Sequence, residues 1–130
     1  PGRVGCLGLG TAAVVVIDDQ TSMIDVLYNC CRFMAHESCG QCTPCREGTN
    51  WSTLILDRIR RGKGRLEDID LLYEIGNSMG VIPGTTICGL ADGAAWPMKN
   101  ATTKFRGEFE EYIRSGRSSV KPVDELMAAH

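Results

Sequence analysis

The sequence predicts a mainly α-helical protein, a bundle of four to five helices preceded by a short β segment. Three observations favour this class. Apolar residues recur at intervals of three and four along most of the chain, which is the spacing of one face of an α-helix. Residues that favour helix starts and stops, such as serine, threonine, proline and glycine, border these periodic stretches. A run rich in β-branched residues is confined to 12–17, so the predicted strand lies near the start of the chain.

The first two predicted helices flank a cluster of cysteines. The first is expected to begin at a capping hydroxyl, Thr21 or Ser22, and to end just before the cysteines, because its apolar stripe stops there. The second is expected to have Thr43 as its N-cap and Pro44 as its first residue, since proline lacks the N–H that would be unpaired at that position. Gly62 is expected to end it. The cysteine cluster is therefore predicted to lie in a loop between two helices.

Three more helices complete the predicted bundle. They are expected over 66–79, from Leu90 or Ala91 to 105, and over 108–114, with a loop at 80–89. Pro97 lies inside the fourth helix and is expected to kink it or to mark its first turn. The resulting domains are 1–20 as the end of an upstream β-rich domain, 21–114 as the helical domain, and 115–130 as a C-terminal tail.

The most specific chemical feature is the spacing of four cysteines. Cys39, Cys42 and Cys45 form a C-x2-C-x2-C motif, and Cys88 stands just before the fourth predicted helix. Three close thiolates and one distant thiolate can hold a [4Fe–4S] cluster, in which each iron takes one protein sulfur. Zinc also takes four cysteines, but usually as two Cys-x2–4-Cys pairs around one ion. The grouping favours the iron–sulfur cluster and leaves open a zinc-stapled or metal-free helical interaction module.

The predicted elements place these thiols at helix starts. Cys45 is expected in the first turn of the second helix, and Cys88 directly before the fourth. The unpaired N–H groups and the positive dipole end of a helix N-terminus stabilise anions, and a thiolate-bound cluster is anionic. Gly40 lets the connecting loop bend without a Cβ penalty. Cysteines that merely filled a bundle core would not be expected at helix junctions.

Composition excludes several other functions. The formal net charge is -2, and the strongest basic run, from Arg58 to Arg65, is followed at once by acids, so a solvated helix end is expected rather than a nucleic-acid site. No apolar run reaches the length that spans a bilayer, so no membrane insertion is expected. Seven cysteines are an odd number, which does not fit a complete disulfide framework. Cys30 and Cys31 lie in an apolar run, and at least one of them is expected to pack as a small hydrophobe.

Three stretches resemble one known family. Residues 36–48 read His-Glu-Ser-Cys-Gly-Gln-Cys-Thr-Pro-Cys-Arg-Glu-Gly, residues 86–97 read Thr-Ile-Cys-Gly-Leu-Ala-Asp-Gly-Ala-Ala-Trp-Pro, and residues 104–110 read Lys-Phe-Arg-Gly-Glu-Phe-Glu. Together they resemble the NADH-oxidising flavoprotein subunit of respiratory complex I and the related subunits of NAD-linked hydrogenases and formate dehydrogenases. The resemblance covers about 5–114.

The resemblance implies a role in electron transfer. In this family NADH reduces FMN, and single electrons then pass through one [4Fe–4S] cluster to the next iron–sulfur centre in a partner subunit. The motifs imply Cys39, Cys42, Cys45 and Cys88 as the ligands, with no catalytic residue. The strand at 12–17 would end a β-grasp domain. FMN and NADH would bind upstream of this chain, so we expect part of an NADH:quinone oxidoreductase that is not active as this fragment. A peripheral position on the cytoplasmic or matrix side of the inner membrane is implied.

Four residues near the cysteines are assigned from the sequence with their alternatives. His36 is expected either to donate a hydrogen bond beside the cluster or to cap the first helix. Arg46 is expected to offset cluster charge or to pair with an acid on its own helix. Trp51 and Phe33 are expected in the core, although Trp51 could instead shield the cluster from water.

Overall fold

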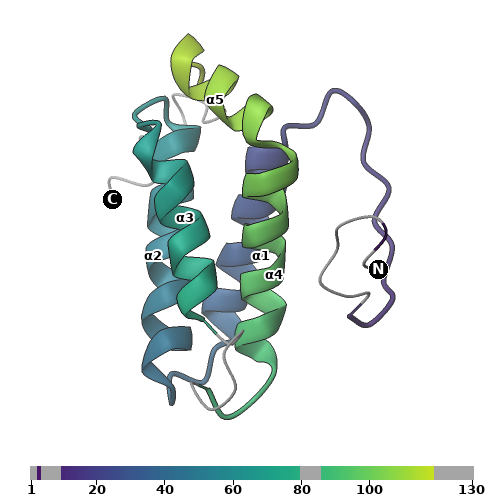
Figure 1. Ribbon diagram of the computed structural model, residues 1–130, viewed down its shortest axis with the longest axis vertical. Coiled ribbons are helices and arrows are strands. Elements are labelled where there is room, and N and C mark those ends of the chain that lie inside the picture. Colours follow the sequence, from purple (N-terminus) through teal and green to yellow (C-terminus); the bar gives the residue numbers. More distant parts are fainter. Residues whose placement is uncertain (1–2, 4–9, 80–85, 119–130) are drawn as a thin grey trace.

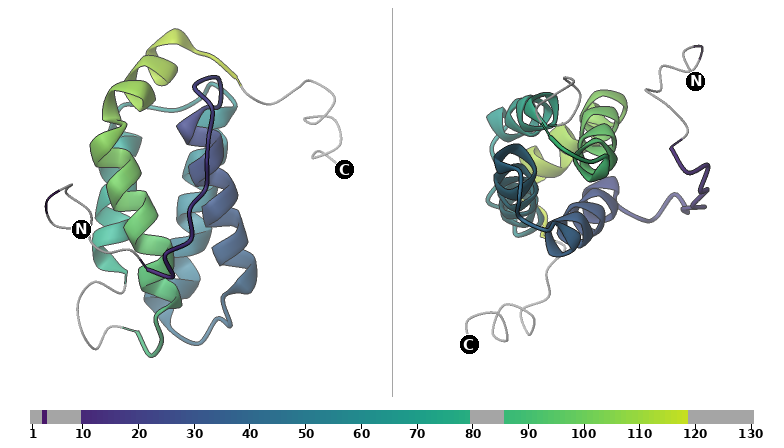
Figure 2. Two further views of the ribbon diagram at one scale, coloured as in Figure 1. Left: turned by 90° about the vertical axis from the view of Figure 1, so that its right-hand side faces the viewer. Right: turned by 90° about the horizontal axis from the view of Figure 1, so that it is seen from below.

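Five α-helices make up the part of the chain that the computed structural model describes, which is residue 3, residues 10–79 and residues 86–118. These are α1 (Met23–Glu37), α2 (Thr43–Arg60), α3 (Glu67–Ser78), α4 (Leu90–Lys104) and α5 (Arg106–Ser115). The first four run up and down side by side, and α5 lies across one end (Figure 1). Seen end-on, the four long helices surround a common centre (Figure 2). The predicted helical bundle is confirmed.

The centre of the bundle is apolar because each helix turns one stripe of its side chains inward. Ile24 and Leu27 of α1 are almost fully buried, as the periodicity predicted. Each large aliphatic or aromatic side chain that is fully buried contributes roughly 1.5–3 kcal/mol of transfer free energy. The other large buried side chains come mainly from the four remaining helices and are Leu56, Ile59, Ile69, Leu72, Met79, Met98 and Phe109.

The helix starts agree with the sequence to within two residues. Ser22 is the N-cap of α1, and its hydroxyl accepts a hydrogen bond from the Ile24 N–H at 3.3 Å. The predicted N-cap of α2, Thr43, is wrong by one residue. Cys42 has the extended backbone of an N-cap, and its carbonyl accepts from the Arg46 N–H at 2.9 Å, so the helix begins with Thr43. The cysteine motif thus continues directly into α2.

Proline does not interrupt the fourth helix. Pro97 lies in the middle of α4, which continues on both sides of it, so the prediction that it marks the first turn is wrong. Its ring removes one N–H donor, which leaves the Gly93 carbonyl without its usual helical partner four residues on. α5 begins at Arg106, two residues before the predicted start at 108.

The opposite end of the bundle from the cysteines is closed by α5. The Met23 N–H at the start of α1 donates to Glu108 at 2.9 Å, and the Tyr112 hydroxyl donates to the Arg60 carbonyl at the end of α2 at 3.1 Å. Two sequentially distant helix ends are therefore both held by α5.

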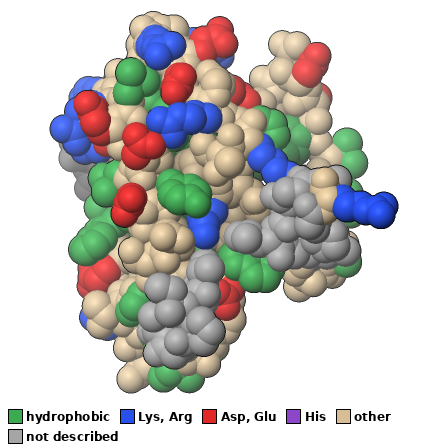
Figure 3. Space-filling model, viewed as in Figure 1, with side chains coloured by type: hydrophobic (Ala, Val, Ile, Leu, Met, Phe, Trp, Pro, Cys, Tyr) green, Lys and Arg blue, Asp and Glu red, His purple; other side chains and the backbone are tan. Residues whose placement is uncertain are grey.

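The basic run near the end of α2 is paired with acids. Arg58 donates to the buried carboxylate of Asp68, and Arg60 donates to Asp25 at 2.7 Å. Acidic and basic side chains are interspersed over the α5 end of the face shown in Figure 3. The acids therefore pair with the basic run, but Asp68 is fully buried, so this helix end is less solvated than the sequence predicted. None of the helices in the described residues is long and apolar enough to cross a bilayer.

Two parts of the sequence prediction need correction or remain open. Trp51 and Phe33 are 54% and 59% exposed, so the prediction that they lie in the core is wrong.

Within the described residues no strand is found, and 12–17 has no regular secondary structure. A strand requires a hydrogen-bonded neighbour. Whether 12–17 belongs to a β-rich domain at 1–20, and whether 115–130 is a tail, stays a prediction, because much of both ranges lies outside the described residues.

Candidate metal centre

The four predicted cysteines meet at one end of the bundle. This is the end opposite α5, where α1 ends and α2 and α4 begin (Figure 1). A cavity of about 120 Å³ lies there, and Cys39, Cys42, Cys45 and Cys88 all line it. The other lining residues are Glu37, Ser38, Gln41, Thr86, Leu90 and Ala91. The fold thus brings the distant cysteine to the other three.

The cavity suits a group of several atoms better than a single ion. One buried water occupies roughly 10–15 Å³ of cavity volume, and this cavity has a volume of about 120 Å³. Among residues 10–79 and 86–118, no three Cys, His, Asp or Glu side chains are arranged to hold one metal ion. The four thiols line this volume. Four soft sulfur donors around such a volume fit an iron–sulfur cluster.

Two helix N-termini open toward this cavity. Cys42 is the N-cap of α2, and Cys88 directly precedes Gly89, the N-cap of α4. In neither helix does the N-cap side chain bond the first-turn N–H groups. These groups, together with the positive dipole end, favour negative charge nearby. The site is therefore suited to an anionic cluster.

Within the described part of the chain, two hydrogen bonds reach cysteine sulfurs. The Ile87 N–H donates to the Cys42 Sγ at 3.3 Å, which connects the segment before α4 to the start of α2. The Ser38 Oγ lies 3.3 Å from the Cys45 Sγ. Cys45 is only 7% exposed, whereas Cys39 and Cys88 are exposed. The sequence did not predict either hydrogen bond: a backbone N–H carries no residue signal, and Ser38 was recognised only as part of the motif.

Arg46 holds the cysteine loop in shape. Its guanidinium donates to the Gly40 carbonyl at 2.7 Å and to the Glu47 carboxylate at 3.1 Å. Gly40 has a φ of 78°, a left-handed conformation that glycine adopts without a Cβ penalty. Of the two interpretations of Arg46, pairing with an acid on its own helix is thus observed. Its hydrogen bond to the Gly40 carbonyl fixes the turn that follows Cys39.

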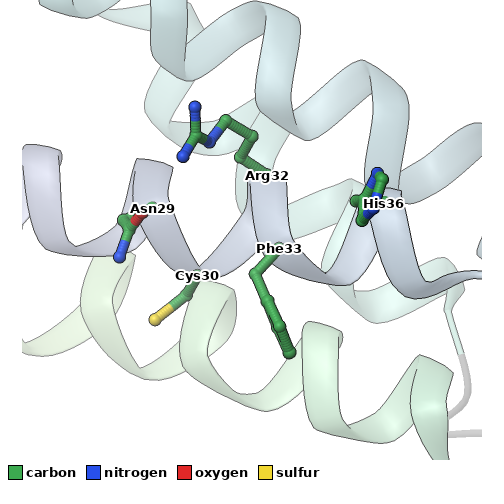
Figure 4. Close-up of a pocket in the computed structure, with 5 residues that line it drawn as sticks. All are labelled: Asn29, Cys30, Arg32, Phe33 and His36. Atoms are coloured by element: carbon green, nitrogen blue, oxygen red, sulfur yellow. The ribbon is translucent and has the colours of Figure 1, made fainter.

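His36 lies outside this site. It is exposed in the last turn of α1, where Ser38 is the C-cap, so the capping interpretation is wrong. His36 instead borders a second hollow, of about 570 Å³, on the outer face of α1. Figure 4 shows its neighbours, with Cys30 and Phe33 pointing toward α4 and Arg32 pointing away. Among the described residues Cys30 is the one thiol bordering that hollow, so it does not offer the four thiolates of an ordinary [4Fe–4S] site.

The remaining described cysteines are held as neutral thiols. Burial raises the pKa of Cys31 to about 12, with a smaller contribution from Cys30, and partial desolvation of the Cys30 sulfur raises its pKa as well, although that residue is exposed as a whole. A raised pKa favours the neutral thiol, whereas the thiolate is the form that binds a metal. Cys31 packs in the core as expected, but Cys30 is exposed. Cys6 lies outside the described residues.

A small helical bundle with a cavity at one end that is lined by four thiols, three of them at or next to helix starts, defines a cluster-binding domain of the iron–sulfur type. Comparison with known proteins specifies it further. The family model for the NADH-ubiquinone oxidoreductase-F iron-sulfur binding region matches residues 25–112, and the chain belongs to this family. Its cofactor is therefore a [4Fe–4S] cluster, which confirms the iron–sulfur prediction over the zinc and metal-free alternatives.

Named relatives come from bacteria and eukaryotes. A bacterial NADH-quinone oxidoreductase subunit, that of Rhizobium meliloti, is 44% identical over 115 residues, which cover 85% of this chain and 26% of that protein. NADH dehydrogenase [ubiquinone] flavoprotein 1, mitochondrial, of Dictyostelium discoideum is 48% identical over 114 residues, which cover 88% of this chain and 23% of that protein. The mitochondrial 51 kDa subunit of NADH-ubiquinone oxidoreductase of Neurospora crassa is 44% identical over 107 residues, which cover 82% of this chain and 21% of that protein. The chain spans about a quarter of the length of these relatives.

Proposed function

We propose that this chain relays single electrons in an NADH:quinone oxidoreductase, with Cys39, Cys42, Cys45 and Cys88 as the ligands of its [4Fe–4S] cluster. One observation carries the ligand assignment. Cys88 stands far from the other three in sequence, yet all four line the same cavity. When bound, the cluster supplies a one-electron carrier whose potential depends on hydrogen bonds, charge and exposure.

The residues of the chain position the sulfurs and limit access of water. Cys45 is held on the inner side of the cavity at 7% exposure, beside Ala91, which is 1% exposed. The contact between Ile87 and Cys42 holds the α4 segment against α2. Arg46 fixes the turn between Cys39 and Cys42 through the Gly40 carbonyl. A rigid, partly dry site needs little rearrangement when its charge changes by one electron.

Electron relay requires no general acid, base or nucleophile from the protein. The cavity is bordered by thiols, small polar groups and apolar side chains, with Glu37 as the one carboxylate among its described lining residues. No bond in a substrate has to be made or broken there. The role of this domain is therefore to conduct electrons between other redox groups.

We infer that the chain works as part of a longer subunit. The relatives are named as NADH dehydrogenase or oxidoreductase subunits, and one as a flavoprotein. FMN and NADH are assigned to a domain upstream of this chain, with 12–17 as the end of its β-grasp part. The isolated chain is not expected to oxidise NADH. Its partners would be that domain and other iron–sulfur subunits, with no nucleic acid, and its place the cytoplasmic or matrix side of the inner membrane without insertion into the bilayer.

Metal content tests the proposal directly. The purified chain should be reconstituted anaerobically with iron and sulfide, and its iron, acid-labile sulfide, zinc and absorption spectrum should be measured. A brown protein with equal iron and sulfide is expected. Zinc without sulfide, or no metal after repeated reconstitution, would contradict the proposal.

Single cysteine substitutions test the ligand assignment. Cys88→Ser should lower cluster content and alter the spectrum, because it removes the ligand that the start of α4 supplies. Cys30→Ser is the matched control, since Cys30 is an exposed thiol outside the cavity. If Cys88→Ser and Cys30→Ser retain the same cluster content and spectrum, the assignment of the fourth ligand is wrong.

A further inference from the structure

We propose that the hydroxyl of Ser38 sets the reduction potential of the cluster by donating a hydrogen bond to the Cys45 sulfur. The inference rests on the proposed function, because it requires Cys45 to be a cluster ligand. Ser38 is then a positioning and tuning residue that acts through Cys45, not a ligand itself.

The neighbours of the hydroxyl determine the direction in which it donates. The Ser38 Oγ lies 3.3 Å from the Cys45 Sγ, and it also accepts a hydrogen bond from the Gly40 N–H at 3.3 Å. A serine hydroxyl has one proton and two acceptor lone pairs. The Gly40 amide uses a lone pair, and a metal-bound thiolate has no proton to give. The serine proton is therefore directed to the Cys45 sulfur.

The backbone holds this hydroxyl in place. Ser38 is the C-cap of α1, and its N–H donates to the Met34 carbonyl at 2.9 Å. Its sulfur partner belongs to the first turn of α2 and is buried. Hydrogen bonds to partly buried groups are electrostatically stronger than hydrogen bonds in open water. Ser38 thus connects two helices at the point where the inner wall of the cavity forms.

The sign of the effect follows from charge. One-electron reduction adds negative charge, which is shared by the ligand sulfurs. A hydrogen-bond donor aimed at a sulfur stabilises the more negative state more than the less negative one, because charge-assisted hydrogen bonds are the stronger ones. Hydrogen bonds to sulfur are among the factors that set iron–sulfur potentials. The Ser38 hydroxyl is therefore expected to raise the reduction potential.

Two substitutions at Ser38 distinguish the effect of its hydroxyl from the effect of side-chain size. Ser38→Ala removes the donor and should lower the midpoint potential, whereas Ser38→Thr keeps the hydroxyl and should restore it. A tenfold change in the electron equilibrium corresponds to about 59 mV for one electron, and a fall of this order is expected for Ser38→Ala. Thr43→Ala is the matched control, because that hydroxyl contacts Arg46 at 3.4 Å instead of a sulfur.

The experiment is a redox titration followed by electron paramagnetic resonance on the reconstituted chain, with iron and sulfide assayed in parallel. The midpoint is read from the loaded fraction, so a partial loss of cluster does not obscure it. An unchanged midpoint in Ser38→Ala, or an equal fall in Thr43→Ala, would overturn the inference. So would a complete loss of cluster in Ser38→Ala, because the hydroxyl would then be needed for assembly.

A separate arm keeps the failure of this inference distinct from failure of the proposed function. Cys45→Ser should alter cluster content and spectrum whatever Ser38 does. If it does not, the ligand assignment is wrong; if it does while the Ser38→Ala midpoint stays constant, only the tuning role is wrong.

Discussion

Gly40 allows a prediction whose size can be worked out from the backbone. Its φ is 78°, in the left-handed region, and a Cβ built there would have the Arg46 Cδ as its nearest neighbour, 3.8 Å away. That distance is an ordinary van der Waals contact, so there is room for a methyl group. Gly40→Ala should therefore be destabilising through backbone strain and not through crowding. A left-handed conformation costs an L-residue roughly 1–2 kcal/mol.

The cost should appear in the stability of the domain. For a domain of about this size, 1 kcal/mol moves the midpoint of thermal unfolding by roughly 4–8 °C, so Gly40→Ala should lower it by about 4–16 °C. The measurement is thermal unfolding of the cluster-free chain followed by circular dichroism, together with iron content after reconstitution. Both should fall, because the strained turn lies between two ligand positions.

Gly40→Asn provides the control for this explanation. Asparagine tolerates the left-handed region better than alanine, although its side chain is larger. It should therefore lose less stability than Gly40→Ala. If the alanine variant unfolds like the wild type, or if asparagine is as damaging as alanine, the strain at φ 78° does not limit this loop and the reasoning fails.

Three further predictions follow from the packing of the bundle. Asp68→Ala should lower the free energy of unfolding by about 1–3 kcal/mol, measured by urea unfolding, because Arg58 and the Arg65 N–H lose their buried acceptor. The larger cost of breaking a fully buried ion pair is not expected, since the Arg58 side chain is 39% exposed. An unchanged free energy of unfolding would contradict this prediction. Gly48→Ala should lower stability by about 1–3 kcal/mol, since its Cβ would lie 2.5 Å from the Met79 Sδ, and in a Met79→Ala background the same change should become neutral or favourable. Cluster-free protein should lose stability as the pH rises from about 9 to about 12. The unfolded chain releases the Cys31 proton near 9.0, whereas burial holds the pKa of Cys31 in the folded chain at about 12. The free energy of unfolding should therefore fall less steeply with pH in Cys31→Ala over this interval.

The sequence was sufficient for the helices but not for every face of them. Helix periodicity and capping residues located α1 to α5 because both reflect local backbone requirements. Trp51 failed as a core residue for a different reason. α2 carries apolar side chains on more than one face, and only the positions of the neighbouring helices decide which face is covered. With Ile55 and Ile59 turned inward, Trp51 and Leu54 remain at the surface.

The convergence of the four cysteines on one site could be predicted from the sequence, whereas the hydrogen bonds around them could not. Cysteine spacing carries the chemistry of ligation in the sequence itself, and the three-dimensional position of Cys88 agrees with it. The Ile87 N–H donor could not have been found in this way, since every residue except proline has one and only the fold aims it at a sulfur. The same holds for the orientation of Ser38, which depends on the end of α1 meeting the start of α2.

The up-and-down order of the helices has a consequence for how the domain can be attached to other proteins. The chain enters α1 and leaves α5 at the same pole, where Glu108 binds the Met23 N–H, and the thiol cavity occupies the other pole (Figure 1). The described segment before α1, residues 10–22, runs from that pole back along the side of the bundle (Figure 2), so a polypeptide joined there approaches along the flank of the helices. The end of the bundle that carries the thiol cavity lies away from both the start of α1 and α5.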